Sequence, residues 1–322
     1  MATLPTTARA FWVTAPGVGE IREEALAAPG NGEVLVEATH SGVSRGTEAL
    51  VLTGRVPESE FERMRCPFQA GDFPAPVKYG YASVGVAQTG TFAGRPVFCL
   101  HPHQSAYVVP ESAVVPVPDG VPPERAVLAA NLETALNATW DGEARAGDRV
   151  SVVGAGVVGC LVAYLVAQIP GTDVELIDVA PERLGVAEAL GVGFASPGGA
   201  ERERDLVIHA SGRPEGAVLA LSLAAQEGTI LELSWFGDQT VTLPLGRDFH
   251  VRRLTLRSSQ VGTVSPSARR RFTHRARLEL ALSLLADARL DRLIDGETSL
   301  DDLPKTMQRL ATSGGLCTRV RY

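Results

Sequence analysis

Apolar and polar positions alternate through the first third of the chain, as is typical of half-buried strands. The run Glu33–Ala38 has this pattern, and the turn signal Pro29-Gly30-Asn31-Gly32 precedes it. We predict further strands at 83–87, 96–100 and 106–109, and a helical turn plus loop over 58–72. The first third is therefore expected to be a β-rich domain.

The pattern changes near Val121. Pro122 and Pro123 are typical of a first helical turn, and we expect the helix to continue to about Trp140. Strand-like and helix-like segments then alternate, which predicts a parallel, doubly wound sheet with right-handed crossovers. The expected strands are 150–153, 173–178, 206–209 and 229–233, and the expected helices are 157–168, 181–190 and 216–225.

The last part of the chain, from Val264, has helical spacing again. We predict an amphipathic helix over 267–287, a shorter helix over 303–311 and a closing strand over 317–322. The hydrophobic pattern therefore predicts an α/β protein with three successive parts: residues 1–121, 122–263 and 264–322.

A glycine motif follows the strand predicted at 150–153. Gly154, Gly156 and Gly159 have the G-x-G-x-x-G spacing, and an apolar helix comes directly after them. The first glycine allows a tight turn, the second lets the backbone approach a pyrophosphate, and the third lets helix and strand pack closely. The free N–H groups at the helix start, at Val157 and Val158, suit the phosphates. We therefore predict a Rossmann-type dinucleotide site.

The strand after this helix ends on an acid, Asp178, 24 residues beyond Gly154. A carboxylate there can accept hydrogen bonds from the adenosine ribose diol, and it would repel a 2′-phosphate. The predicted cofactor is therefore NAD and not NADP.

Composition narrows the function classes. The chain has 322 residues, 45% hydrophobic content and a formal net charge of −7, which argues against nucleic-acid and membrane-surface partners. The run Arg269-Arg270-Arg271 is interpreted as a solvated helix face. The four cysteines are scattered, and Met1–Ala10 lacks the pattern of a secretory signal. We expect a cytoplasmic protein.

The order of these parts resembles the medium-chain dehydrogenase/reductase superfamily, of the zinc-type alcohol dehydrogenase kind. The segments that carry a closer resemblance, to the branch with bacteriochlorophyllide a dehydrogenases, are 41–48, 53–57 and 80–85. The resemblance implies a GroES-like catalytic domain (1–121), a Rossmann NAD-binding domain (122–263) and a segment that returns to the catalytic domain (264–322). It also implies a homodimer.

The chain departs from this family at the zinc ligands. Ser44 stands where zinc members have a catalytic cysteine, Tyr81 where they have a histidine, and Ala130 near the third ligand. Zinc requires three or four Cys, His or carboxylate ligands, which these residues do not provide. The four-cysteine lobe that holds a structural zinc is missing too. His101 and His103 are only two ligands, which is too few for a metal site. We predict no metal.

Without zinc, the substrate oxygen needs another proton donor and another stabiliser. By their place in the family pattern, Ser44, Thr47, Tyr81 and Glu133 are the catalytic candidates: two hydroxyls, a phenol and a possible base. Tyr81 has a plainer interpretation, in which it only fills the space of the metal.

Substrate binding is assigned to Arg45, Lys78 and His101. The two cations would suit an acidic or phosphorylated small molecule and would lower the pKa of Tyr81. Arg45 has a structural alternative, a pair with Glu48, and the two histidines have another, a polar edge or pocket wall.

The resemblance adds four cofactor contacts. Arg183 corresponds to a basic position over adenine, Ser211 follows a strand near the cofactor, and Ser259 and Gln260 lie where relatives hold the nicotinamide carboxamide. His209 is interpreted as a satisfied core histidine.

We therefore predict a zinc-independent oxidoreductase that moves a hydride between NAD(H) and a secondary alcohol or ketone in the cleft between the domains. Two alternatives stay open: a zinc-free enone or quinone reductase that uses NADPH, and a dinucleotide-binding protein without catalysis.

Overall fold

The computed structural model describes residues 4–322. Residues 1–3, which belong to the predicted first domain and to the segment searched for a secretory signal, lie outside the described residues. The chain forms two compact units. Unit 1 holds the residues up to Ala130 with Leu282–Ala288 and Ile294–Tyr322, and unit 2 holds Asn131–Ala281 with Arg289–Leu293. The division therefore differs from the predicted ranges, because residues 264–281 pack with unit 2.

Unit 1 is built on two sheets. The smaller has the order β2-β1-β5-β4, and the larger has the order β16-β17-β3-β6-β7-β9, with β8 paired to β3. The strands are β1 Thr7–Ala15, β2 Val18–Ala25, β3 Glu33–Val43, β4 Ala70–Gly71, β5 Val77–Lys78, β6 Ser83–Ala87, β7 Pro96–Cys99, β8 Ala106–Pro110, β9 Val114–Pro116, β16 Ile294–Ser299 and β17 Cys317–Arg321.

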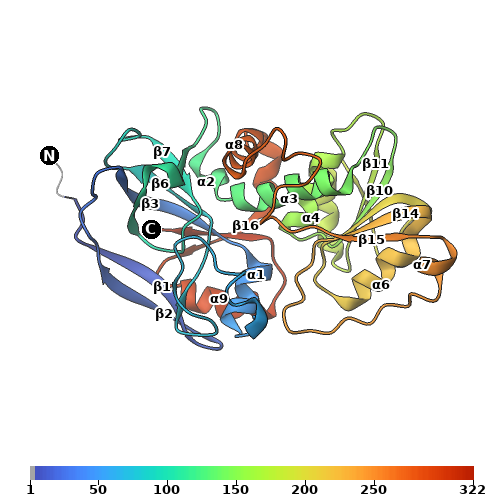
Figure 1. The fold of residues 1–322 in the computed structure, drawn as a ribbon, viewed down its shortest axis with the longest axis horizontal. Helices are drawn as coiled ribbons and strands as arrows, with labels where there is room; N and C mark the ends of the chain where they lie inside the picture. Colours follow the sequence, from blue (N-terminus) through green and yellow to red (C-terminus); the bar gives the residue numbers. More distant parts are fainter. Residues whose placement is uncertain (1–3) are drawn as a thin grey trace. The chain divides into compact units, whose positions relative to one another are not determined.

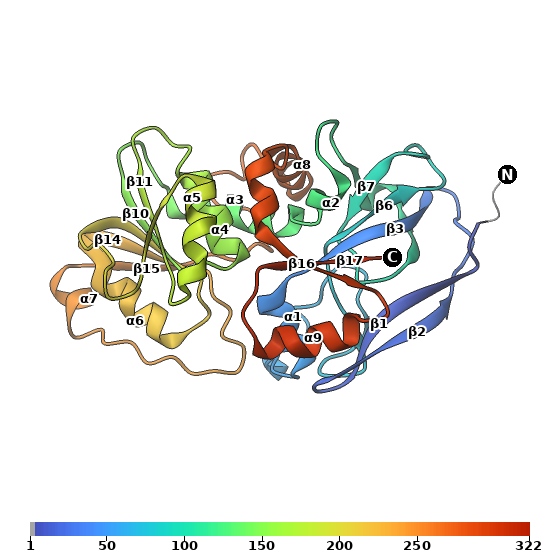
Figure 2. The same ribbon diagram turned by 180° about the vertical axis from the view of Figure 1, so that it is seen from behind.

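The helices of unit 1 are short. They are α1 Arg45–Leu52, α2 Pro123–Ala126 and α9 Leu303–Thr312, with 3-10 turns at Glu58–Glu60 and Glu111–Ala113. Figure 2 shows α9 beside α1, which brings the end of the chain next to its first quarter. Both faces of β3 are covered, since Val34, Leu35 and Val36 are all fully buried. Val34 and Val36 pack in one core cluster with Val97 and Tyr107.

Unit 2 is a parallel sheet of order β12-β11-β10-β13-β14-β15. Figure 1 shows α4 and α6 beside these strands. Its elements are α3 Ala129–Gly142, β10 Arg149–Val153, α4 Val157–Val166, β11 Asp173–Ile177, α5 Leu184–Leu190, β12 Gly193–Ala195, β13 Arg204–His209, α6 Pro214–Leu223, β14 Ala224–Glu232, α7 Asp248–Val251, β15 Thr255–Ser258 and α8 His274–Leu284, with 3-10 turns at Pro181–Arg183 and Ala288–Leu293. The predicted fold class, a β-rich domain with a doubly wound parallel-sheet domain, is confirmed.

Two helix predictions need correction, and one helix was missed. The helix expected from Pro122 to Trp140 is two helices, because the Leu128 N–H bonds back to the Arg125 carbonyl at 3.0 Å in a tight turn between them. The long helix expected over 267–287 shortens to α8, since the Ser265 N–H donates to the Asn137 side chain and the Ser267 hydroxyl donates to the Trp140 carbonyl, both on α3. Helix α1 was not predicted.

The apolar stretch 150–168 is a strand, a turn and a helix. Across residues 4–322 the structure has no helix that is both long and apolar enough to cross a membrane.

Candidate functional site

The glycine turn of unit 2 connects β10 to α4 at the carboxyl edge of the sheet. Gly154 has φ +111°, and a Cβ on it would lie 2.6 Å from the Ser211 backbone. A Cβ on Gly159 would lie 1.9 Å from the Gly154 carbonyl oxygen. Both positions therefore require glycine for the turn itself.

Gly156 is different, because a Cβ there would meet nothing within 4 Å. It is the N-cap of α4, and no side chain caps the helix there. Open space in front of uncapped N–H groups is what a pyrophosphate needs. The residues present therefore fit a dinucleotide, with Gly156, Val157 and Val158 around its phosphates.

Asp178 comes directly after β11 at the same edge. Its Oδ2 accepts a hydrogen bond from the Ala155 N–H at 2.7 Å, and its Oδ1 accepts one from the Ala180 N–H at 2.9 Å. The carboxylate is thus fixed to the glycine turn, and each oxygen keeps a lone pair for a ribose hydroxyl. Arg183 is half-buried on the turn that follows.

Ser211 follows β13 and belongs to a hydrogen-bonded array. His209 is fully buried, with Nδ1 2.7 Å from the Glu232 carboxylate and Nε2 2.6 Å from the Ser211 hydroxyl. The Ser211 oxygen also accepts the Arg213 N–H at 3.2 Å. His209 is therefore a satisfied core histidine that fixes Ser211, as predicted. Glu232 was missed, because only the pairing of β13 with β14 brings it there.

Ser259 and Gln260 follow β15. The Ser259 hydroxyl donates to Asp141 of α3 at 2.6 Å, and the Gln260 side chain accepts the Gly262 N–H at 2.7 Å. The side chain of Ser259 is thus used to hold the loop, while its backbone lies at the carboxyl edge.

In unit 1 the structure brings Ser44, Thr47 and Tyr81 together. The Tyr81 hydroxyl is hydrogen-bonded to the side chains of both other residues. Burial raises the pKa of Tyr81 to about 12, and the Glu48 carboxylate adds to this. The prediction that Arg45 and Lys78 would lower this pKa is wrong, because burial and Glu48 act in the opposite direction.

A buried network lies next to this cluster. Glu48 is 3% exposed, accepts the Ser44 N–H at 2.7 Å and lies 2.8 Å from His103 Nε2. His103 Nδ1 lies 2.7 Å from the Ser41 hydroxyl, which is 2.9 Å from the Tyr322 hydroxyl. The sequence analysis missed this network, since its members lie up to 281 residues apart.

Two predicted substrate contacts have other partners. Lys78 is buried, with Nζ 2.6 Å from Glu24 and 2.7 Å from Gln104, so its charge is neutralised within unit 1 and a contact with substrate is not supported. His101 stacks on Tyr107 with 3.8 Å between ring centres. Burial lowers the pKa of His101 to about 3, so it offers no positive charge to an acidic substrate.

Glu133 belongs to unit 2, where it is buried and lies 3.0 Å from Nε of Arg277. Burial raises its pKa, and Arg277 opposes this. An ion-paired, buried carboxylate is a poor general base, so the catalytic assignment of Glu133 is not supported by its contacts.

Zinc does not fit the residues at the family's ligand positions. Ser44 and Tyr81 bond to each other, and Ala130 carries only a methyl group. Among residues 4–322 no group of three or more His, Cys, Asp and Glu side chains is arranged to hold a metal ion.

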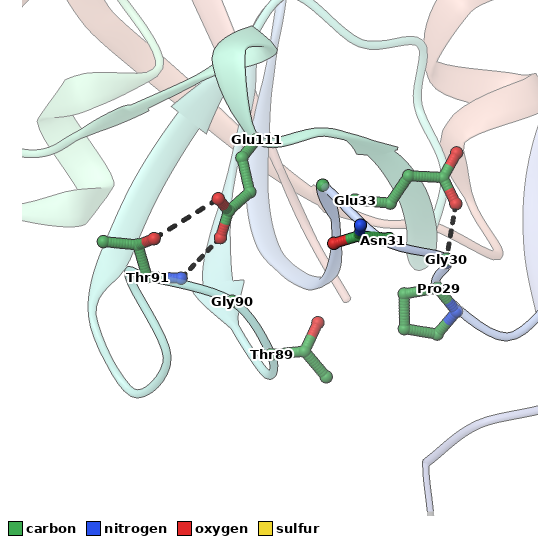
Figure 3. Close-up of a pocket in the computed structure, with 9 residues that line it drawn as sticks. Pro29, Gly30, Asn31, Glu33, Thr89, Gly90, Thr91 and Glu111 are labelled. Atoms are coloured by element: carbon green, nitrogen blue, oxygen red, sulfur yellow. Dashed lines mark hydrogen bonds between the residues drawn. The ribbon is translucent and has the colours of Figure 1, made fainter.

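A surface hollow lies elsewhere in unit 1. It has a volume of about 560 Å³ and lies between the 29–33 turn and the 89–91 turn (Figure 3). Its two carboxylates, Glu33 and Glu111, accept backbone N–H groups at 2.8 and 2.5 Å. They brace the turns, and none of the predicted site residues lines the hollow.

Comparison with known proteins gives relatives of one kind. No family model matches the chain. It is 24% identical over 246 residues to a (R,R)-butanediol dehydrogenase of Bacillus subtilis, which covers 65% of this chain and 66% of that protein. It is 36% identical over 116 residues to an L-threonine 3-dehydrogenase of Mesorhizobium japonicum, 36% of this chain and 33% of that protein. The matches thus span two thirds and one third of these relatives.

Solved structures match along the whole chain. L-idonate 5-dehydrogenase of Escherichia coli has a TM-score of 0.81 at 16% identity, with 98% of both chains covered. A Sinorhizobium meliloti protein described as a zinc-binding dehydrogenase and bound to NADP has 0.79 at 20%, covering 99% and 100%. An E. coli alcohol dehydrogenase in complex with NADH has 0.77 at 16%, covering 99% and 100%. The chain therefore has the same fold as these dehydrogenases.

Proposed function

We propose that this protein is a medium-chain dehydrogenase that interconverts a secondary alcohol and a ketone with NAD(H) and without zinc. The observation that carries the proposal is that one chain holds both a dinucleotide-type glycine turn, in unit 2, and the Ser44–Thr47–Tyr81 cluster, in unit 1. The first fits a cofactor, and the second offers hydroxyl groups where zinc relatives have ligands.

The bound nicotinamide would supply or accept the hydride. Tyr81 would serve the substrate oxygen, because a phenol with a pKa of about 12 stays protonated at neutral pH and can donate to a developing alkoxide. Ser44 and Thr47 would orient this phenol through their hydrogen bonds. An enone reductase would need less of this machinery, so the cluster favours alcohol and ketone chemistry.

NAD is proposed over NADP on account of Asp178, whose carboxylate is held at the glycine turn. Solved structures of this fold bind either cofactor, so the acid is the feature that discriminates. Fluorescence titration with NADH and NADPH tests this directly. Tighter binding of NADPH would rule out the role of Asp178.

A panel of candidate alcohols, ketones and enones tests the substrate class. The names of the two curated relatives favour small diols and hydroxy amino acids as first candidates. We expect a change in nicotinamide absorbance with secondary alcohols or their ketones. A change only with enones and NADPH would support the reductase alternative, and NADH binding without turnover would support the catalytically inactive one.

A homodimer is part of the proposal. Strand β15 is an edge of the parallel sheet, and its four residues, Thr255–Ser258, are all exposed. Such an edge offers backbone groups to a second strand. Light scattering of the purified protein should give about twice the 34.0 kDa chain mass.

A further inference from the structure

The loop after β15 is held by a buried arginine of the tail. Arg277 on α8 is 2% exposed and makes three contacts. Its Nε donates to Glu133 at 3.0 Å, its Nη1 to the Asn137 side chain at 2.7 Å and its Nη2 to the Val261 carbonyl at 2.6 Å. The guanidinium therefore connects α8 and α3 to the loop.

The same loop is fixed at neighbouring points. Asn137 accepts the Ser265 N–H at 3.0 Å, Asp141 accepts the Ser259 hydroxyl at 2.6 Å, and His274 Nε2 lies 3.1 Å from the Gly262 carbonyl. Gln260, Gly262 and Thr263 are nevertheless exposed. The loop thus combines a buried anchor with exposed residues.

The position of this loop along the sheet indicates which half of the cofactor it would face. A dinucleotide with its pyrophosphate at the turn after β10 and its adenosine at Asp178 after β11 must extend its other half in the opposite direction. In this sheet that direction leads past β13 and β14 toward the loop after β15. The loop 259–263, with its exposed residues Gln260, Gly262 and Thr263, therefore lies on the nicotinamide side of the edge.

We propose that Arg277 is the positioning residue for the nicotinamide half of the cofactor: it orders the 259–265 loop before the cofactor binds. The inference rests on the proposed dinucleotide function. It predicts that loss of Arg277 weakens the binding of ligands that carry nicotinamide and leaves the binding of ligands that lack it unchanged. Without Arg277 the loop would have to become ordered when the nicotinamide binds, and this ordering reduces the affinity.

The experiment compares NADH with ADP-ribose, which lacks the nicotinamide. Arg277→Met should raise the Kd of NADH about tenfold and leave that of ADP-ribose within about twofold. Because Arg277→Met alone leaves Glu133 buried and unpaired, the double variant Arg277→Met/Glu133→Leu protects the fold and should show the same split. Arg277→Lys should restore part of the NADH affinity.

Arg275→Met is the matched control, since Arg275 is on the same helix and pairs with Glu279 at the surface. It should bind both ligands as the wild type does. Equal weakening of NADH and ADP-ribose in the double variant, or unchanged NADH binding, would overturn the inference. Wild-type protein that binds neither ligand would instead remove the proposed function, and this inference with it.

Discussion

The glycine turn of unit 2 and the tyrosine cluster of unit 1 are built in opposite ways. The turn is made of backbone within one short segment, where Gly154 and Gly159 leave no room for a side chain. The cluster depends on side chains from separate elements, with Tyr81 bonded to Ser44 and Thr47, next to the Glu48–His103 pair. The two regions should therefore respond differently to substitution.

The largest expected effects separate two glycines of the turn. Gly159→Ala should destabilise the fold by about 4 kcal/mol, because its methyl would overlap the Gly154 carbonyl. Gly156→Ala should fold as the wild type does yet bind NADH at least about tenfold more weakly, since the methyl would occupy the space assigned to the pyrophosphate. Urea denaturation and NADH fluorescence measure the two quantities. Wild-type NADH affinity in Gly156→Ala would contradict the assignment.

This contrast also explains what the sequence could predict. A local motif determines the turn, so its glycines and Asp178 could be placed from spacing alone. The Glu48–His103–Ser41–Tyr322 network needs the pairing of β17 with β3 and the approach of His103, which no short pattern records. The contacts of Lys78 and Glu133 could not be predicted for the same reason, since their partners Glu24 and Arg277 are distant in sequence.

A second prediction tests the cluster itself. Tyr81→Phe removes the hydroxyl that would serve the substrate oxygen, so kcat should fall about 10²- to 10⁴-fold with NADH affinity unchanged. Tyr79→Phe is the control, because that ring lies edge-on to Tyr81 and its hydroxyl donates to the Met64 carbonyl. Steady-state kinetics decide the matter, and equal losses in both variants would point to a packing defect.

The buried Glu48–His103 pair next to the cluster gives a further test of the comparison. Glu48→Ala leaves the Ser44 N–H and His103 without their acceptor, which should reduce the free energy of unfolding by about 3 kcal/mol. NADH affinity should not change, because the glycine turn is in the other unit. The exposed Glu58→Ala is the control. A loss of NADH binding in folded Glu48→Ala would break the proposed independence of the two regions.

The smallest effect concerns pH. His101 is buried with its pKa lowered from 6.5 to about 3, so the unfolded chain takes up a proton that the folded protein excludes. Stability should therefore fall as the pH drops from about 6.5 toward 3, by about 2 kcal/mol from this residue at pH 5. His101→Phe keeps a ring against Tyr107 and should show a smaller loss between pH 7 and pH 5 in urea denaturation. An identical loss would show that His101 is not the source.

The central claim, redox chemistry with a dinucleotide and side chains alone, has one direct test. Protein purified without added metal is analysed for zinc and then assayed for NADH-dependent ketone reduction with and without a chelator. The account predicts far less than one zinc per chain, and activity that the chelator leaves unchanged. Stoichiometric zinc, with activity that the chelator abolishes and zinc restores, would contradict it.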